Sequence, residues 1–337
     1  MKALFIGGTG TISMAITRQL AGMSDWDLYL LNRGNRASDV PEGVHSIIAD
    51  ISDEVDCREK LKELQFDVVC DFIAFTKDQV ERDYRLFNGK TKQYIFISSA
   101  SAYQKPLSSA VITESTPLAN PHWEYSRNKI ACEEFLMAKY REHQFPVTIV
   151  RPSHTYDERK VPLGVHGDHG SWQIIKRMLD GKPVIIHGDG TSLWTMTHNT
   201  DFAKGFIGLM GNIHAIGETF QITSDESLTW NQIYQTIADA LGVTHHPYHV
   251  TSEFLAATGK YDLTGSLIGD KANSVIFDNT KLKRAVPEFV ATTRFDQGIK
   301  KSIDYILNHP ECQTEDPEFD AWCDSIINAL EQAKSQF

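Results

Sequence analysis

The sequence predicts an α/β fold: a doubly wound parallel sheet with a smaller C-terminal α/β domain behind it. Two observations lead to this prediction. Short apolar runs of strand length alternate with helical segments through residues 1–155, and this alternation builds parallel strands joined by right-handed crossovers. The first apolar run is also followed by a glycine-rich turn and then by apolar residues at helical spacing. We therefore expect a strand, a tight turn and a helix at the N-terminus.

Composition excludes several classes of protein. The 337 residues can bury a large core and indicate one large domain or two closely joined ones. A net charge of −11 argues against a nucleic-acid partner and against anionic membrane surfaces. The five cysteines are scattered, which predicts reduced thiols and a cytoplasmic protein rather than disulfides. No apolar run is long enough to span a membrane, and we read residues 1–6 as a core strand rather than a leader.

The N-terminal turn points to a bound dinucleotide. Lys2 to Ile6 is the strand, and Gly7-Gly8-Thr9-Gly10 breaks it before the helix. Free N–H groups at such a helix N-terminus bind a pyrophosphate, and Ser13 is a small replacement for the third glycine of the usual spacing. The alternative is a glycine turn without a ligand. The residues expected to meet the cofactor here are Gly7, Thr9, Gly10, Thr11 and Ile12.

The end of the second strand bears on the choice of cofactor. Asp27 to Leu31 is this strand, and Asn32-Arg33-Gly34 follows it. An acid at this point would accept hydrogen bonds from the ribose and would mark NAD. A guanidinium pairs instead with a 2′-phosphate, so Arg33 favours NADP over NAD. The alternative is that Arg33 is a solvated charge or stacks on adenine, and Arg36 is a second candidate for the phosphate.

Three further strands complete the N-terminal half of the sheet. They are expected at 44–48, 66–73 and 93–97, with helices at 54–64 and 80–87 between them. In a doubly wound sheet, Asp50 and Ile51 would lie beside the adenine. Ile73, Ala74 and Phe75 would lie beside the dinucleotide, or all five would only pack at the strand ends.

The fifth strand leads into a group of hydroxyl side chains at the edge of the sheet. Ser98, Ser99 and Ser101 come directly after it, and a helix is expected from Pro121 to His143. Tyr125 and Lys129 are four residues apart and share one face of that helix. A nearby ammonium favours the phenolate and so brings a phenol, with a pKa near ~10, into useful range as a base. A serine hydroxyl can hydrogen-bond the same substrate oxygen.

These segments together resemble a known family. Gly7 to Ile12, Ile97 to Tyr103, Tyr125-x-x-x-Lys129 and Val150-Arg151-Pro152 are similar to the extended short-chain dehydrogenase/reductases, the NAD(P)-dependent sugar epimerases and dehydratases. The resemblance is strong to about residue 155. It implies a Rossmann domain and a substrate domain. It also implies that Tyr125 is the catalytic acid/base, that Lys129 holds the nicotinamide ribose, and that Ser99 rather than Ser98 or Ser101 is the catalytic serine.

The chain departs from the family at two places. The family's dehydratases carry Asp-Glu directly after the catalytic Ser/Thr, whereas this chain has Ala100-Ser101, so we do not expect 4,6-dehydration. In the segment 188–201, Trp194 stands near the arginine that often contacts a nucleotide-sugar pyrophosphate, which weakens the case for a nucleotide sugar. The Asn32-Arg33-Gly34 strand end and the Trp194 segment also resemble an atypical branch that includes plastid RNA-binding relatives.

The loop after Arg151 is the least predictable part of the chain. His166, Asp168 and His169 could ligate a metal, supply a second acid/base or simply be polar loop residues. Zinc enzymes place their histidines on helices or strands rather than in glycine-flanked loops, so we expect no metal site. In the family this loop borders the substrate. The residues expected to face the substrate are Ser101, His154, His166 and Trp194.

The rest of the chain predicts the second domain. We assign residues 1–155 to the dinucleotide-binding domain, with parts of 183–222 returning to it, and 156–337 mainly to the substrate domain. Strands are expected at 183–186 and 218–222 and helices at 172–180, 200–210, 227–242, 278–283, 295–307 and 319–333. Residues 251–276 have no clear pattern.

The sequence thus favours an NAD(P)-dependent oxidoreductase or epimerase that acts on a hydroxyl of a sugar or nucleotide sugar. The alternative is a non-catalytic dinucleotide-binding protein with a regulatory or RNA-binding role, and a redox role for Cys70 or Cys132 is a third reading. A small molecule is the expected partner. The family resemblance implies a homodimer through helices 77–88 and 121–143.

Overall fold

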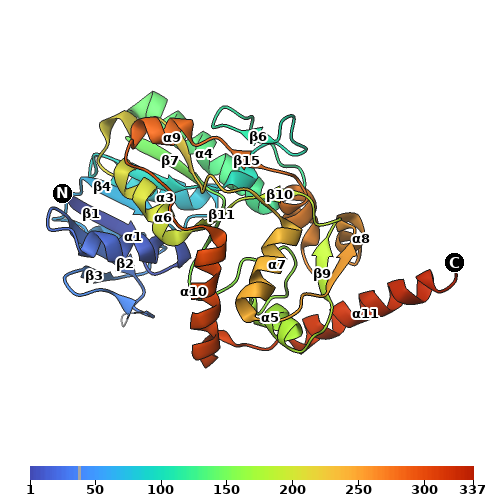
Figure 1. Cartoon of the computed structure of the whole chain (residues 1–337). Coiled ribbons are helices and arrows are strands. Elements are labelled where there is room, and N and C mark those ends of the chain that lie inside the picture. Colours follow the sequence, from blue (N-terminus) through green and yellow to red (C-terminus); the bar gives the residue numbers. More distant parts are fainter. Residues whose placement is uncertain (37–38) are drawn as a thin grey trace.

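The structure is a computed structural model that describes residues 1–36 and 39–337. Within these residues, one sheet of parallel strands occupies the N-terminal half of the molecule (Figure 1). Its strand order is β12-β7-β5-β4-β1-β2-β3. The bounds are β1 (Lys2–Ile6), β2 (Asp27–Asn32), β3 (His45–Ile48), β4 (Val68–Asp71), β5 (Tyr94–Ile97), β7 (Val147–Pro152) and β12 (Thr219–Ile222). The order runs in opposite directions from β1, so the predicted doubly wound α/β fold is confirmed.

Helices cover both faces of this sheet because its central strands are apolar on both sides. Ala3 and Phe5 of β1 pack in the cluster that holds α1 (Thr11–Ala21) and α6 (Asn199–Leu209). The alternate residues Leu4 and Ile6 pack in the cluster that holds the other three helices. These are α2 (Glu54–Lys60), α3 (Lys77–Phe87) and α4 (Glu124–His143). Alternation along β1 therefore separates two cores, one on each face.

Three predicted elements in this half have wrong bounds, and local hydrogen bonds explain one of them. The helix expected from residue 80 begins at Lys77. Gln79 Oε1 accepts hydrogen bonds from the backbone nitrogens of Phe75 (2.6 Å) and Thr76 (3.1 Å), which fixes the first turn three residues earlier. The helix expected at 54–64 ends at Lys60, and the fourth strand is shorter than 66–73.

The C-terminal half is built from helices and four small two-stranded sheets. Its helices are α5 (Trp172–Leu179), α7 (Trp230–Leu241), α8 (Ser252–Ala257), α10 (Phe295–Asn308) and α11 (Pro317–Lys334). Helix α9 (Thr280–Ala285) lies instead on the main sheet, where Leu282 packs in the same cluster as α6. The paired strands are β6 (Val111–Ile112) with β15 (Ile276–Phe277), β8 (His154–Tyr156) with β11 (Met196–His198), β9 (Val184–His187) with β14 (Pro247–Val250), and β10 (Leu193–Trp194) with β13 (Leu228–Thr229). Short 3₁₀ turns are η2 (Ala100–Ala102), η3 (Ile213–Ala215) and η5 (Pro310–Cys312), and η4 (Thr264–Lys271) is a π-helix.

The segment 183–222 divides between the two halves. Helix α6 and strand β12 lie on the main sheet, whereas β9 pairs with β14 outside it. The domain boundary near residue 155 stays a prediction.

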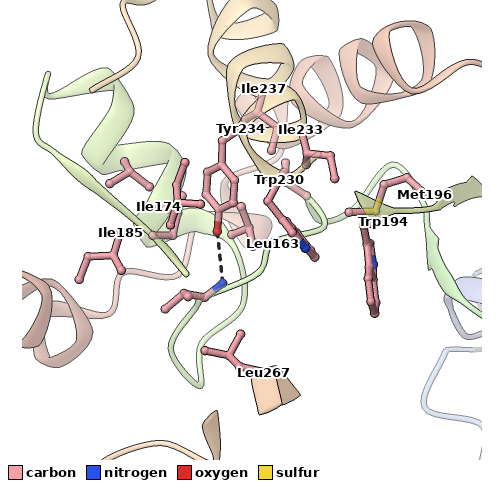
Figure 2. Packing of buried hydrophobic residues seen from close by; sticks show 14 of the residues in the cluster. Leu163, Ile174, Ile185, Trp194, Met196, Trp230, Ile233, Tyr234, Ile237 and Leu267 are labelled. Atoms are coloured by element: carbon pink, nitrogen blue, oxygen red, sulfur yellow. Dashed lines mark hydrogen bonds between the residues drawn. The ribbon is translucent and has the colours of Figure 1, made fainter. Parts of the chain in front are cut away.

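The aromatic side chains of α7 organise the core of the C-terminal half (Figure 2). The Tyr234 hydroxyl accepts hydrogen bonds from the backbone nitrogens of Gly164 (3.1 Å) and Val165 (3.2 Å), and one of these is drawn in Figure 2. The rings of Trp230 and Trp194 lie 5.6 Å apart between their centroids. The loop after β8 and the strand β10 are thus both anchored on α7, which positions the residues around the second cavity described below.

Helix α11 ends the chain and extends away from the body (Figure 1). Phe319 and Trp322 near its start are buried, as the sequence predicts for core residues. In the part of the chain that is described, no helix has both the length and the apolar character needed to cross a membrane.

Candidate active site

Two cavities open at the carboxyl ends of the sheet strands. The first has a volume of about 610 Å³ and is lined by the glycine turn and by the ends of β2, β3 and β4. The second has a volume of about 450 Å³ and is lined by η2, the start of α4, β8, β10 and η4. Ligands of doubly wound sheets bind at this edge, where the strand order reverses.

The glycine turn has a backbone that only glycine adopts easily. Gly7 and Gly8 have φ values of +101° and +96°. A Cβ on Gly8 would lie 2.6 Å from Leu30 Cδ2, and one on Gly7 would lie 3.1 Å from Ile73 Cγ2. A residue with a side chain at either position would therefore strain the backbone, and at Gly8 it would also clash with Leu30 of β2. Bare backbone at the wall of a strand-end cavity of about 610 Å³ fits a dinucleotide.

The serine in place of the third glycine has a local role. Ser13 is buried, and its hydroxyl accepts a hydrogen bond from the backbone nitrogen of Gly10 at 2.9 Å. Ser13 thus stabilises the first turn of α1 and occupies one N–H of the glycine turn. Gly10, Thr11 and Ile12 lie at this helix start, next to the first cavity but outside its lining.

The end of β2 contributes Asn32, Arg33 and Arg36 to the first cavity. Asn32 Oδ1 accepts a hydrogen bond from the backbone nitrogen of Gly34 at 2.8 Å, so the Asn32 side chain stabilises the loop that follows β2. Arg36 donates to the carbonyl of Thr9 at 2.9 Å and so ties this loop to the glycine turn. Arg33 is exposed at the cavity wall, which leaves its guanidinium accessible to a ligand.

The end of β3 lines the same cavity through Asp50 and Ile51. Asp50 accepts hydrogen bonds from the Ser52 side chain and from its backbone nitrogen at 3.0 Å. These bonds, together with the nearby Arg33 and Arg82 guanidinium groups, lower the pKa of the Asp50 carboxyl. Asp50 is therefore an ionised acceptor at the cavity wall, and Arg33 stands close to it.

Three residues in or next to the wall of the first cavity were not predicted from the sequence. Gln79 and Arg82 line it from α3, three residues apart on one face of the helix. Asp71, at the end of β4, accepts hydrogen bonds from the backbone nitrogens of Ile73 (2.6 Å) and Ala74 (2.8 Å). The signal that could have found them is an acid at a strand end followed by polar residues at helical spacing. Asp71 holds Ile73 in the cavity lining.

Lys129 lies between the two cavities. Its ammonium donates hydrogen bonds to the carbonyls of Ala74 and Ile97, both at 2.7 Å. It also lies 4.6 Å from the ring centroid of Phe75 and 5.8 Å from that of Tyr125. Burial lowers the pKa of Lys129 to about 8. Ala74 and Phe75 therefore join the site through Lys129, although neither lines the first cavity.

Tyr125 and Ser99 meet in the second cavity. Burial raises the pKa of Tyr125, a hydrogen bond with Ser99 opposes that shift, and the charge of Asp270 adds to it. The lowered phenol pKa expected from Lys129 is thus not observed in this structure. The physical reason is that the Lys129 ammonium is directed at two backbone carbonyls, while the phenol is shielded from water.

The three serines after β5 have different partners. The Ser98 hydroxyl donates to Glu133, which is held in a buried ion pair by Arg151, so Ser98 points away from the cavity. Ser101 Oγ lies 2.9 Å from Ser99 Oγ and accepts a hydrogen bond from Ser126 at 2.7 Å. Ser99 and Ser101 both line the second cavity, and Ser101 orients Ser99.

Of the other residues expected to face the substrate, two line the second cavity and one does not. His154 and Trp194 line it, and the Trp194 indole donates to His154 Nδ1 at 3.2 Å. Burial holds the pKa of His154 well below its ordinary value, so this ring is neutral. His166 lies outside the lining, and its Nδ1 is 2.7 Å from the carbonyl of Gly167.

Four charged residues in the second cavity were not predicted. They are Lys105, Lys160, Asp270 and Lys271. Lys105 precedes a proline in a loop, and Asp270 and Lys271 come from the stretch without a clear pattern. They reach the cavity only through long-range packing, so no local signal in the sequence identifies them.

Metal ligands and reactive thiols do not gather at either cavity. Among the described residues, no group of three or more His, Cys, Asp or Glu side chains could hold a metal ion. Cys70 and Cys132 are buried, and burial raises the pKa of Cys132 to about 12. Both therefore behave as core thiols, which weakens a redox role.

Comparisons with known proteins cover most of the chain. The model of the NAD dependent epimerase/dehydratase family matches residues 3–223. The 2′-dehydrokanamycin reductase of Streptomyces kanamyceticus is 25% identical over 273 residues, which cover 78% of this chain and 76% of that protein. The chloroplast stem-loop binding protein of 41 kDa b of Arabidopsis thaliana is 25% identical over 254 residues, which cover 72% of this chain and 63% of that protein.

Solved structures agree in fold. The dTDP-glucose 4,6-dehydratase of Bacillus anthracis in complex with NAD has a TM-score of 0.74 at 18% identity, covering 92% of this chain and 98% of that one. The UDP-glucuronic acid 4-epimerase of Bacillus cereus in complex with NAD has a TM-score of 0.72 at 20% identity, covering 91% and 99%. At these identities the likeness shows a shared fold.

Proposed function

The chain belongs to the NAD dependent epimerase/dehydratase family, as its motifs predicted, and we propose that it is an NAD(P)-dependent reductase or epimerase acting on a sugar hydroxyl. The observation that carries this proposal is the position of Tyr125, Ser99 and Lys129. Tyr125 and Ser99 line the second cavity, and Lys129 lies between that cavity and the one lined by the glycine turn.

The first cavity supplies the groups that would hold the dinucleotide. The backbone of Gly7 and Thr9 would face the pyrophosphate, Asp50 and Ile51 the adenosine, and Ile73 the middle of the molecule. When bound, the nicotinamide ring supplies the chemistry of accepting or donating hydride. Lys129 would donate to the nicotinamide ribose in addition to the two carbonyls it already contacts.

The protein's own residues handle the proton. During oxidation Tyr125 would act as a phenolate and take the proton of the substrate alcohol, and during reduction it would act as a phenol and give its proton to the substrate oxygen. Ser99 hydrogen-bonds the same oxygen and is held in place by Ser101. Because burial raises the pKa of Tyr125, the phenol keeps its proton at neutral pH and can donate it to the substrate oxygen in reduction.

The substrate class rests on the relatives. The names of the similar proteins include a reductase of a dehydro-aminoglycoside and enzymes of nucleotide sugars. Ala100 and Ser101 follow Ser99 in place of an Asp-Glu pair, so we propose reduction or epimerisation rather than 4,6-dehydration. Trp194 in the cavity wall favours a sugar ring that stacks on an aromatic side chain.

For the cofactor we propose NADP ahead of NAD. Arg33 lines the first cavity at the end of β2, where a 2′-phosphate would lie, and its guanidinium is close enough to Asp50 to lower the pKa of that carboxyl. A homodimer through α3 and α4, which pack side by side, stays a prediction.

The experiment is a spectroscopic assay of the full chain. NADPH or NADH is added with keto sugars, and NADP⁺ or NAD⁺ with sugar alcohols and nucleotide sugars, while nicotinamide absorbance is followed. A reductase shows net oxidation of NADPH. An epimerase shows no net change in absorbance but converts the sugar, which chromatography detects. Conversion of no sugar with any dinucleotide would contradict the proposal.

A second function merits a test because one relative is named for binding stem-loops. An RNA-binding role predicts salt-dependent retention of RNA by the pure protein, since phosphate contacts dominate such binding. The net charge of −11 argues against this outcome.

A further inference from the structure

The π-helix η4 contributes to the wall of the second cavity, which Ser99 also lines. It comes from the stretch 251–276 that has no clear sequence pattern, and it ends in Asp270 and Lys271, which both line the cavity. π-Helices are rare and occur often at functional sites. The position of η4 therefore raises the question of what its two charged residues do there.

Close packing fixes η4 against the start of α4. A Cβ on Gly265 would lie 2.1 Å from Trp123 Cδ1, and one on Gly269 would lie 3.2 Å from Asn120 Oδ1. The buried Asn120 amide donates to the carbonyls of Gly269 (2.7 Å) and Ser101 (2.8 Å). The Asn120 amide thus links η4 to the serine turn that carries Ser99, so the residues of η4 have a defined place at the cavity.

The carbonyl of Lys271 is held equally firmly. It accepts hydrogen bonds from the Trp230 indole and the Ser192 hydroxyl, each at 3.2 Å, and lies 3.2 Å from His187 Nε2. The backbone at Lys271 is therefore anchored in the core of the C-terminal half. The Lys271 side chain is the part of this residue that can contact a ligand in the cavity.

The charges in this wall do not balance. Lys105 is 4% exposed and Lys271 is 8% exposed, and among the residues that the structure describes Asp270 is the only acid in the cavity lining. Lys105 Nζ lies 4.0 Å from Asp270 Oδ1, and within the described residues Lys271 Nζ has no hydrogen bond or ion pair. Lys160 adds a further positive charge to the lining. An enclosed ammonium without a partner is costly, so an anion that enters the cavity gains from it.

We propose that Lys105 and Lys271 form an anion-binding subsite beside Tyr125 that holds a carboxylate or phosphate group of the substrate. Asp270 keeps the two ammonium groups apart and limits the net charge when the cavity holds no anion. The subsite deepens the proposed function, since it names the substrate class as acidic sugars or sugar phosphates. Its positive charge stands out in a chain whose net charge is −11.

The neighbouring titratable groups support this reading. Burial lowers the pKa of Lys271, and the charge of Asp270 opposes that shift. Burial raises the pKa of Asp270, and Lys105 and Lys271 oppose it. Lys271 also contributes to the low pKa of His154, so its ammonium lies near the cavity rather than away from it. The remaining groups that face the subsite are Lys160 and Tyr125.

The test is calorimetric binding of four probes to the full chain, with and without NADP⁺. The probes are glucose, glucuronate, glucose 1-phosphate and UDP-glucose. We expect glucuronate or glucose 1-phosphate to bind about tenfold more tightly than glucose, the size of one charge-assisted contact. Lys271→Met should bring this ratio close to one, and Asp270→Asn should raise it. Lys105→Met tests the second ammonium, and Lys300→Met, at an exposed site on α10, is the matched control.

The probes also identify the source of the anion. If Lys271→Met loses binding of glucuronate alone, the subsite holds a sugar carboxylate. If it loses binding of the phosphate esters, the subsite holds a phosphate. An unchanged ratio in a folded Lys271→Met protein, or no preference of the wild type for any anionic probe at millimolar concentration, overturns the subsite. Because binding is measured without turnover, an intact subsite in a protein that converts no sugar with any dinucleotide would contradict only the proposed function.

Discussion

The two cavities at the strand ends differ in what lines them, since backbone dominates the first and side chains dominate the second. The first is made largely of backbone and strand ends that lie within residues 7–82, and its shape depends on two glycines with positive φ. The second collects side chains from residues 99–277, including hydroxyls at η2 and α4 and charges from η4. Adding a Cβ should therefore damage the first cavity, whereas removing a functional group should damage the second.

The largest effect is expected from Tyr125→Phe. This change removes the hydroxyl that exchanges the proton and leaves the first cavity untouched, so kcat/KM should fall by about 10²- to 10⁴-fold while dinucleotide affinity is unchanged. Steady-state kinetics and calorimetric titration of NADPH measure the two quantities. Turnover that survives in the variant would remove Tyr125 from the chemistry.

The converse change is Gly8→Ala, with Gly89→Ala as its control. Both glycines have positive φ, but a Cβ on Gly89 meets nothing within 4 Å, whereas one on Gly8 meets Leu30 at 2.6 Å. Both variants should lose about 1–2 kcal/mol of stability from the backbone alone. Only Gly8→Ala should also lose dinucleotide affinity, by tenfold or more. Equal affinity losses in the two variants would show that the turn has no special role.

Lys129, which lies between the cavities, should make the free energy of unfolding depend on pH. The pKa of Lys129 is about 8 in the folded chain, against an ordinary value of 10.5. Between these values the unfolded chain binds more protons, so the free energy of unfolding should rise with pH relative to Lys129→Met. The expected difference is about 1–2 kcal/mol between pH ~7 and pH ~9.5, measured by urea denaturation. Parallel pH profiles for the two proteins would contradict the burial of this ammonium.

The smallest effect concerns the choice of dinucleotide. Arg33→Ala should weaken NADP⁺ binding by about tenfold, the value of one charge-assisted contact to a phosphate, and leave NAD⁺ binding nearly unchanged. Arg36→Ala is the comparison, because Arg36 is already bonded to Thr9. If both cofactors lose affinity equally, Arg33 acts on the adenosine rather than on a 2′-phosphate.

The same contrast explains what the sequence could predict. The strand-end residues of the first cavity follow from short local patterns, since a glycine turn, a strand end and a helix start each fix their neighbours. Tyr125 and Lys129 follow from the spacing of one helix. Lys105, Asp270 and Lys271 do not, because they meet only when η4 docks on Trp123 and Asn120. His166 was expected at the substrate because the family's loop after the sixth strand borders it, but His166 lies outside the cavity lining.

Calorimetric titration of the pure full chain with NADP⁺ and with NAD⁺ tests the central claim most directly. We predict that one molecule of dinucleotide binds per chain, that NADP⁺ binds more tightly, and that Gly8→Ala weakens binding by tenfold or more while Gly89→Ala keeps it. No binding of either dinucleotide to the folded wild-type protein would contradict the account.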